Sequence, residues 1–266
     1  MEIPAARWYR VIDKRRSRRR FDPRPIDPDM LEQIRALCAS FQPFPHARAT
    51  LVTESPDRIF KGAVGPYGKI KGALSVIAFI GNMLSPHVQE QVGYTGEGII
   101  LETTAFNLDT CWVGGFFRPE VAKVLAGTRE NERVLAVTPV GYAAERQSVE
   151  ERLMTGFGLT HRRRPLSGLV TGLEALNWPS WVKAALEAAR LAPSAVNRQP
   201  WRFHVEPDSI AVSVNRSGRE FGLSKRLCCG IAMLHIEVAA MTHGRHGKWE
   251  FLEPPQVARF VTENNR

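Results

Sequence analysis

Two separated segments of this chain contain residue types that can hold an anion and a planar ligand. The first is K-R-R-S-R-R-R-F-D at residues 14–22. Guanidinium groups pair with phosphate oxygens through directional, charge-assisted hydrogen bonds. The second is A-P-S-A-V-N-R-Q-P-W at residues 192–201, in which Ser194 and Asn197 can bond to local backbone or to a ligand. We therefore expect one segment to bind an anion and the other to form a pocket wall; a plain proline-broken turn is the alternative for the second.

The second segment follows a predicted helix. Trp181, Ala185, Ala188 and Leu191 recur at helical spacing, and Pro193 prevents the helix from continuing. A β-like stretch begins at Trp201. The segment is thus expected to be a loop between a helix and a strand.

The first segment is followed by a second amphipathic helix, expected over 30–41. Asp27 is its predicted N-cap, and Pro28 falls in its first turn. The remaining chain alternates between helical and buried-strand patterns, which indicates helices packed on a sheet. The expected strands are residues 49–54, 74–80, 134–140, 201–205, 210–214 and 248–252.

Together, the two segments resemble motifs of the flavin-dependent nitroreductase family. The sequences of that family begin with an R-R-S-x-R-x-F-like motif that binds the FMN phosphate, and a loop like A-P-S-x-x-N-x-Q-P-W lies against the flavin. The stretch 94–115 resembles the family's long central helix and glycine turn, and 161–170 resembles its basic ending. The resemblance implies an α+β nitroreductase-like fold, with a central, mostly antiparallel sheet flanked by helices.

The resemblance also implies a set of cofactor-binding residues. Arg15, Ser17 and Arg19 are expected at the phosphate and ribityl chain, with the Arg16 backbone nearby, and Arg163 is expected to return to the phosphate. Lys69 is expected near the pyrimidine edge of the flavin, with a solvated lysine as the alternative. The flavin-facing residues implied are Val113, Gly114, Gly115, Pro193, Ser194, Ala195 and Asn197. A role in bracing the loop is the alternative for Asn197.

One departure from the family pattern suggests a fused pseudo-dimer. Ordinary members carry both motifs one short helix apart, whereas here most of the chain separates them. We expect a first half at 1–170 that grips the phosphate and a shorter second half at 171–266 that supplies the A-P-S wall, joined by a crossover at 147–176. A weak sequence similarity between residues 98–110 and residues 230–244 supports two pseudo-symmetric halves. The alternative is that these are two unrelated buried helices. This interpretation predicts a monomer with one FMN per chain.

Composition limits the other classes of function. The net charge of +9 suggests a nucleic-acid binder, but no helix-turn-helix, zinc-finger or aromatic-plus-basic strand signature accompanies it. No apolar run approaches the roughly 20 residues that span a bilayer. The four cysteines lack disulfide or metal-ligand spacing, which favours a reducing cytoplasm. No metal site and no nucleic-acid or membrane partner are expected.

These observations predict an FMN-dependent oxidoreductase. The resemblance implies that NADH or NADPH reduces the flavin and leaves, and that an electron-poor small molecule then takes its place, which is a ping-pong mechanism. No side chain is expected to carry the chemistry, because the flavin N5 receives the hydride. Another FMN-dependent redox reaction and a protein that only stores or senses FMN remain alternatives.

Overall fold

The computed structural model describes residues 1–63, 69–144, 162–215 and 224–263. The helices are α1 (Ala5–Ile12), α2 (Pro28–Ser40), α3 (Asp57–Phe60), α4 (Val88–Ala105), α5 (Pro119–Leu125), α7 (Ser180–Leu191) and α8 (Lys225–Thr242), with short 3-10 helices η1 (Leu166–Gly168), η2 (Ala175–Asn177) and η3 (Ala195–Asn197). The strands are β1 (Ala47–Val52), β2 (Ser75–Asn82), β3 (Asp109–Thr110), β4 (Glu132–Gly141), β5 (Val170–Gly172), β6 (Trp201–Glu206), β7 (Ser209–Val214), β8 (Gly247–Phe251) and β9 (Gln256–Thr262).

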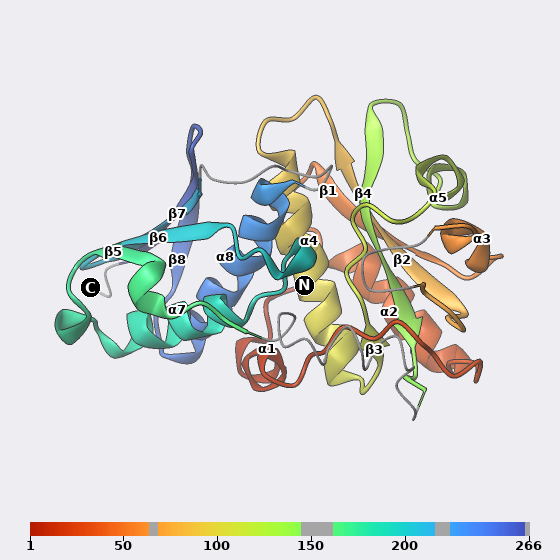
Figure 1. The fold of residues 1–266 in the computed structure, drawn as a ribbon, viewed down its shortest axis with the longest axis horizontal. Coiled ribbons are helices and arrows are strands. Elements are labelled where there is room, and N and C mark those ends of the chain that lie inside the picture. Colours follow the sequence, from red (N-terminus) through yellow and green to blue (C-terminus); the bar gives the residue numbers. More distant parts are fainter. Residues whose placement is uncertain (64–68, 145–161, 216–223, 264–266) are drawn as a thin grey trace.

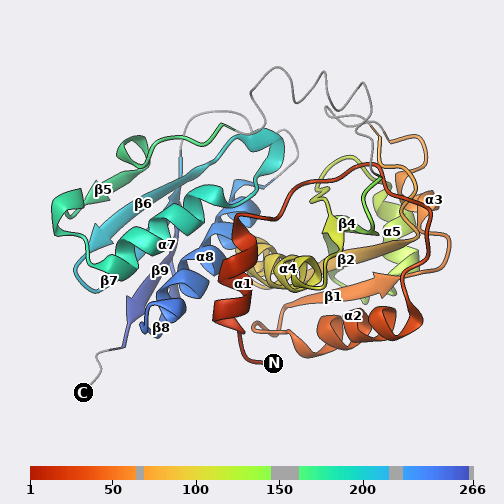
Figure 2. The same cartoon turned by 90° about the horizontal axis from the view of Figure 1, so that it is seen from below.

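The strands form two sheets (Figure 1). The first is antiparallel in the order β1-β2-β4-β3, and the second has the order β5-β6-β7-β9-β8, in which only β5 and β6 run parallel. The α+β class is confirmed, but the strands do not form the single central sheet expected from the sequence. Instead, helices α1, α4, α7 and α8 lie between the two sheets (Figure 2).

Strand β2 shows why the first sheet is covered on both faces. Its side chains alternate between faces, as in any strand. Ile77 and Phe79 pack in the main core with α2 and α4, whereas Val76, Ala78 and Ile80 pack in a second core with α3 and α5. A continuous apolar run is typical of a strand buried on both sides.

Helices α4 and α8 meet backbone to backbone at the centre of the molecule. Each has 18 residues, and each carries a glycine at its sixth position, Gly93 and Gly230. A Cβ on Gly93 would lie 2.0 Å from the Leu227 carbonyl oxygen, and one on Gly230 would lie 1.9 Å from that of Glu90. Since Glu90 and Leu227 both occupy the third position of their helix, the contact is reciprocal, as across a twofold axis.

This contact corrects the alignment of the two helices that was expected from the sequence. The sequence comparison aligned Gly98 with Gly230, but in the structure Gly93 is the residue of α4 that corresponds to Gly230. Apolar periodicity alone does not distinguish such shifts, because several positions of a buried helix are equally hydrophobic.

The local elements around the two motifs agree with expectation. Asp27 accepts a hydrogen bond from the Asp29 backbone N–H at 2.9 Å and caps α2. Helix α7 ends at Leu191, directly before the A-P-S loop, and β6 begins at Trp201. Of the expected crossover, residues 147–161 lie outside the described residues, while β5 from Val170 already pairs with the second sheet.

No helix within the described ranges is both long enough and apolar enough to cross a membrane.

Candidate functional site

A cavity of about 380 Å³ lies between the first sheet, the N-terminal part of α8 and the A-P-S loop. Its volume falls in the range of small-molecule sites. Sequence-distant segments converge on it. The lining residues are Ser17, Arg19, Phe60, Ala63, Ile70, Gln89, Cys111, Trp112, Val113, Gly114, Gly115, Phe116, Leu135, Ala136, Pro193, Ser194, Ala195, Val196, Ser224, Leu227, Cys228 and Ile231.

The arginine-rich segment reaches the cavity as extended backbone. Arg18 donates its backbone N–H to the Thr110 carbonyl at 2.9 Å, and residues 19–21 exchange backbone hydrogen bonds with Lys71. Because side chains alternate along extended backbone, Ser17 and Arg19 line the cavity. Arg18 does not; its Nε lies 3.6 Å from a carboxylate oxygen of Asp109.

Arg15 is buried behind this wall with unused hydrogen-bond donors. The residue is 7% exposed. Its Nε and Nη1 have no hydrogen-bond partner among the described residues, and the nearest carboxylate oxygen, on Glu97, lies 3.8 Å from Nε. Burial lowers the pKa of Arg15, which the charge of Glu97 partly offsets. Unsatisfied buried donors are costly, and a bound anion would supply the missing acceptors.

The A-P-S loop forms the opposite wall in an unusual backbone conformation. Pro193, Ser194 and Ala195 line the cavity, and the Ser194 hydroxyl accepts a hydrogen bond from the Gln199 backbone N–H at 2.9 Å. Val196 has φ 47°, which is rare for a β-branched residue. Such strain often marks functional segments.

Asn197 and Arg163, both predicted to contact the cofactor, bond to each other instead. Arg163 Nη1 donates to Asn197 Oδ1 at 2.6 Å, and its Nη2 donates to the Leu191 carbonyl at 2.9 Å. Neither residue lines the cavity. The structure therefore gives Asn197 the bracing role, because its amide is already used to hold the loop.

Arg163 is half-buried and nevertheless lies near other cations, among them the buried Arg15. Burial, followed by the charges of Arg15, Arg16 and Arg190, lowers its pKa to about 10. A second brace comes from Gln199, whose Oε1 accepts the Arg164 backbone N–H at 2.8 Å. The returning basic segment is thus held beside the loop, not against the cavity.

The glycine turn leaves two backbone donors for a ligand. Val113 exchanges backbone hydrogen bonds with Val137 at 2.9 and 2.8 Å, so its N–H is not available, contrary to expectation. Gly114 and Gly115 line the cavity, and neither donates its N–H to a backbone oxygen of the described chain.

Lys69 and Arg16 also lie off the cavity wall, as do the buried Arg15 and the bonded pair Arg163 and Asn197. Lys69 is exposed, and the wall begins at its neighbour Ile70. Arg16 turns its side chain back to the carbonyl oxygens of Asp13 and Arg15. His161, part of the basic ending, lies outside the described residues.

Sequence reasoning missed the contribution of α8 and of several apolar residues. Leu227, Cys228 and Ile231 line the cavity from one face of α8, and Phe60 and Phe116 line it from the first half. The only sequence signal of the three α8 residues is helical spacing in an apolar stretch, which is equally typical of a core helix.

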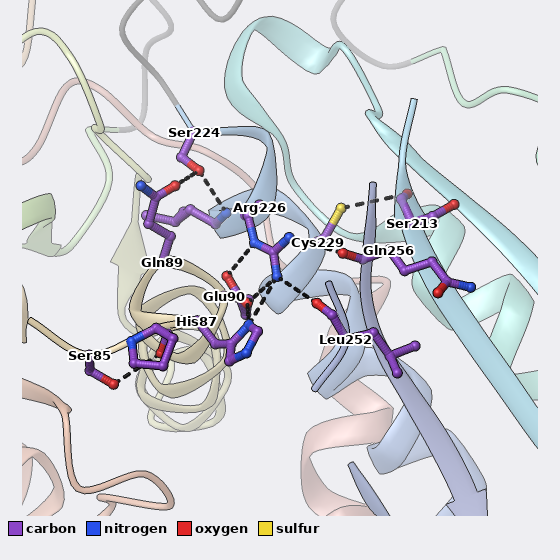
Figure 3. A network of polar contacts seen from close by, with 12 residues as sticks. Ser85, His87, Gln89, Glu90, Ser213, Ser224, Arg226, Cys229, Leu252 and Gln256 are labelled. Carbon is purple, nitrogen blue, oxygen red and sulfur yellow. Dashed lines mark hydrogen bonds and ion pairs between the residues drawn. The ribbon is translucent and has the colours of Figure 1, made fainter. Parts of the chain in front are cut away.

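At the helical positions of α4 that correspond to the cavity-lining positions of α8, the space is filled by side chains. Glu90, Gln91 and Tyr94 occupy the same helical positions as the three lining residues of α8. Arg226 Nε donates to Glu90 Oε2 at 2.9 Å, and the same guanidinium reaches the carbonyls of Leu252 and Gln256 (Figure 3).

Aromatic rings complete this closure. Phe44, in the loop after α2, packs edge-on against Tyr94 with ring centroids 5.1 Å apart and against Phe251 at 5.5 Å. The His87 ring stacks on Phe251 at 5.1 Å. The cavity therefore lies beside the N-terminal part of α8, whereas the corresponding region beside α4 is filled with packed side chains.

Within the described ranges, no group of three or more His, Cys, Asp or Glu side chains is arranged to hold a metal ion.

The fold is that of a nitroreductase-like α+β protein. The model of the family described as "Putative TM nitroreductase" matches residues 7–240, and the chain belongs to this family. This membership confirms the resemblance and supports a nitroreductase-like oxidoreductase. No curated protein matches the sequence.

A solved structure from Thermotoga maritima, described as a "putative nitroreductase", has the same fold: it shares 20% identity with a TM-score of 0.66, covering 96% of this chain and 93% of that one. Two other solved structures are also similar to the chain. A nitroreductase family protein of Clostridium difficile 630 shares 18% identity (TM-score 0.46; 60% and 94% covered). An FMN-dependent nitroreductase of Clostridium difficile R20291 shares 16% identity (TM-score 0.42; 52% and 88% covered).

Proposed function

We propose that this protein is an FMN-dependent oxidoreductase that uses NADH or NADPH to reduce an electron-poor small molecule. The observation that carries the proposal is the buried Arg15, whose guanidinium has donors without acceptors beside a cavity built from both ends of the chain. A phosphate-bearing ligand fits such a group because it brings several acceptor oxygens and negative charge.

The residues present fit FMN. Arg15, Ser17 and Arg19 would hold its phosphate and ribityl chain, and Pro193, Ser194 and Ala195 would form one wall against the ring. The N–H groups of Gly114 and Gly115 would face the ring edge at which hydride arrives, since glycine allows close approach of the backbone. Lys69 would act electrostatically at the opposite edge by stabilising negative charge.

When bound, FMN supplies two-electron transfer between the nicotinamide donor and the acceptor. The chain's own task is to orient both substrates and exclude water. Phe60, Ile70 and Leu227 give the cavity an apolar lining suited to flat, uncharged rings. One cavity then serves donor and acceptor in turn, which leads to ping-pong kinetics.

We further propose that the chain is a pseudo-dimer with halves at 1–170 and 171–266, and that it acts as a monomer with one FMN. The reciprocal contact of Gly93 and Gly230 supports this, as does the closure of the matching position by Phe44 and Phe251. The four cysteines are free and buried, which supports a cytoplasmic location.

The test begins with the absorption spectrum of the purified protein. We expect a yellow protein with one FMN per chain that bleaches on adding NADH or NADPH and recovers its colour with a nitroaromatic acceptor. Initial-rate plots should give parallel lines, whereas intersecting lines would contradict the ping-pong step. A yellow protein that does not bleach would indicate storage or sensing, and a colourless protein retained by DNA at moderate salt would indicate a nucleic-acid binder.

A further inference from the structure

A buried acid–histidine pair joins the two central helices behind the cavity. Glu97 on α4 and His235 on α8 are both 0% exposed, and Glu97 Oε1 lies 3.0 Å from His235 Nε2. The other carboxylate oxygen, Oε2, accepts the indole N–H of the cavity-lining Trp112 at 2.6 Å. The function proposed above assigns no role to this pair.

His235 also supports the helix that leads into the A-P-S loop. Its Nδ1 lies 2.8 Å from the Ala188 carbonyl oxygen on α7. The Ala192 N–H, which would reach Ala188 in a continuing helix, bonds to Ala189 at 3.1 Å instead. The imidazole therefore supplies a donor to a carbonyl near the end of α7, five residues before the cavity wall begins at Pro193.

These contacts fix where the hydrogens lie. A carbonyl oxygen only accepts, so Nδ1 must carry a hydrogen. If Glu97 were ionised and Nε2 carried none, two lone pairs would face each other at 3.0 Å in a dry interior, which is strongly unfavourable. One hydrogen between Nε2 and Oε1 would remove this repulsion, and the pair would then carry no net charge wherever that hydrogen resides.

We propose that His235 and Glu97 share a proton, and that this neutral pair leaves the positive charge of Arg15 available to the anion that enters the cavity. Without the shared proton, the Glu97 carboxylate, 3.8 Å from Arg15 Nε, would neutralise that guanidinium. His235 and Glu97 are positioning residues, since they act through Arg15, Trp112 and the end of α7. The inference rests on the proposed function, in which the anion is the phosphate of FMN.

The first experiment compares the affinities of the apoprotein for FMN and for riboflavin, which lacks the phosphate. His235→Phe keeps a ring but removes the proton, so we expect FMN to bind about tenfold more weakly, with riboflavin changed less than about threefold. Glu97→Gln keeps the acceptor for Trp112 and offers a donor to Nε2, so both affinities should remain within about threefold. The double variant should regain most of the FMN affinity.

A matched control lies on the same pair of helices. Glu237 on α8 accepts the Trp249 indole N–H at 2.7 Å and the Tyr94 hydroxyl at 2.6 Å, away from the cavity. Glu237→Gln should change neither affinity. Equal losses for FMN and riboflavin in His235→Phe, or FMN binding more than tenfold tighter in Glu97→Gln, would overturn the proposal.

Nitrogen NMR of the native protein gives a second readout, which does not depend on how the variants fold. The His235 ring should show a protonated Nδ1 in the native protein; an Nδ1 without a hydrogen would refute the pair as described. Native protein that binds neither flavin would instead refute the proposed function.

Discussion

Gly93 and Gly230 occupy the same position of two equally long helices, and each lies against the backbone of the other helix. A methyl group at either position would overlap a carbonyl oxygen, so the helices would have to separate. Because Leu227, against which Gly93 packs, also lines the cavity, a change in the spacing of α4 and α8 would move part of the cavity wall.

Gly93→Ala and Gly230→Ala should each lower the free energy of unfolding by more than about 2 kcal/mol, because backbone atoms cannot move aside as side chains do. Urea unfolding measures this. Gly168→Ala is the matched control, since nothing lies within 4 Å of its added Cβ; its stability should change by less than about 0.5 kcal/mol. Equal stabilities for all three variants would contradict the close crossing.

Arg15→Ala and Arg19→Ala should each weaken FMN binding by about 10- to 100-fold, because each removes charge-assisted donors. Flavin fluorescence titration measures the dissociation constant. Arg18→Ala is the control, because Arg18 pairs with Asp109 outside the cavity. Unchanged flavin content in Arg15→Ala would refute the phosphate assignment.

Glu132 should make stability depend on pH in the acid range. Arg48 Nε and Nη2 donate to its two carboxylate oxygens at 2.9 and 2.6 Å, and these bonds hold the pKa of Glu132 below its ordinary value. Since the folded pKa is the lower one, the stabilisation is present above the unfolded pKa and is lost as pH falls through the folded pKa.

Glu132→Gln should therefore cost about 1–3 kcal/mol of unfolding free energy at pH 7 and progressively less as the pH falls below about 4. Chemical denaturation at several pH values gives both numbers. Glu32→Gln, which breaks an exposed pair with Arg35, should cost less than about 1 kcal/mol throughout. A pH-independent cost for Glu132→Gln would contradict the assignment.

Val196→Asn should stabilise the protein. Val196 combines φ 47° with a side chain that is 42% exposed, and asparagine adopts this backbone region more readily. We expect a gain of about 0.5–1.5 kcal/mol in the free energy of unfolding. Val124→Asn, at an exposed site of regular helix α5, should bring no gain; a gain there as well would point to a general surface effect.

The sequence was sufficient to predict what local chemistry determines. Pro193 ends α7 and Asp27 caps α2, as their residue types predict. Strand β9 was not predicted, because its flanking Pro254 and Pro255 interrupt the pattern that marks a strand.

Contacts between distant residues were beyond prediction. Glu97 and His235 are separated by 138 positions, and nothing in either neighbourhood indicates the other. The division into two sheets likewise depends on which strands pair, and short apolar runs do not encode their partners. The bond between Asn197 and Arg163 could not be predicted for the same reason, since Arg163 comes from another part of the chain.

The open cavity and its packed counterpart have a consequence for how this protein can change. When two identical subunits form two sites, one codon alters both at once. Here the corresponding positions Leu227 and Glu90 are encoded separately, so the lining of the cavity can change while the packing of Phe44 against Tyr94 and Phe251 is retained.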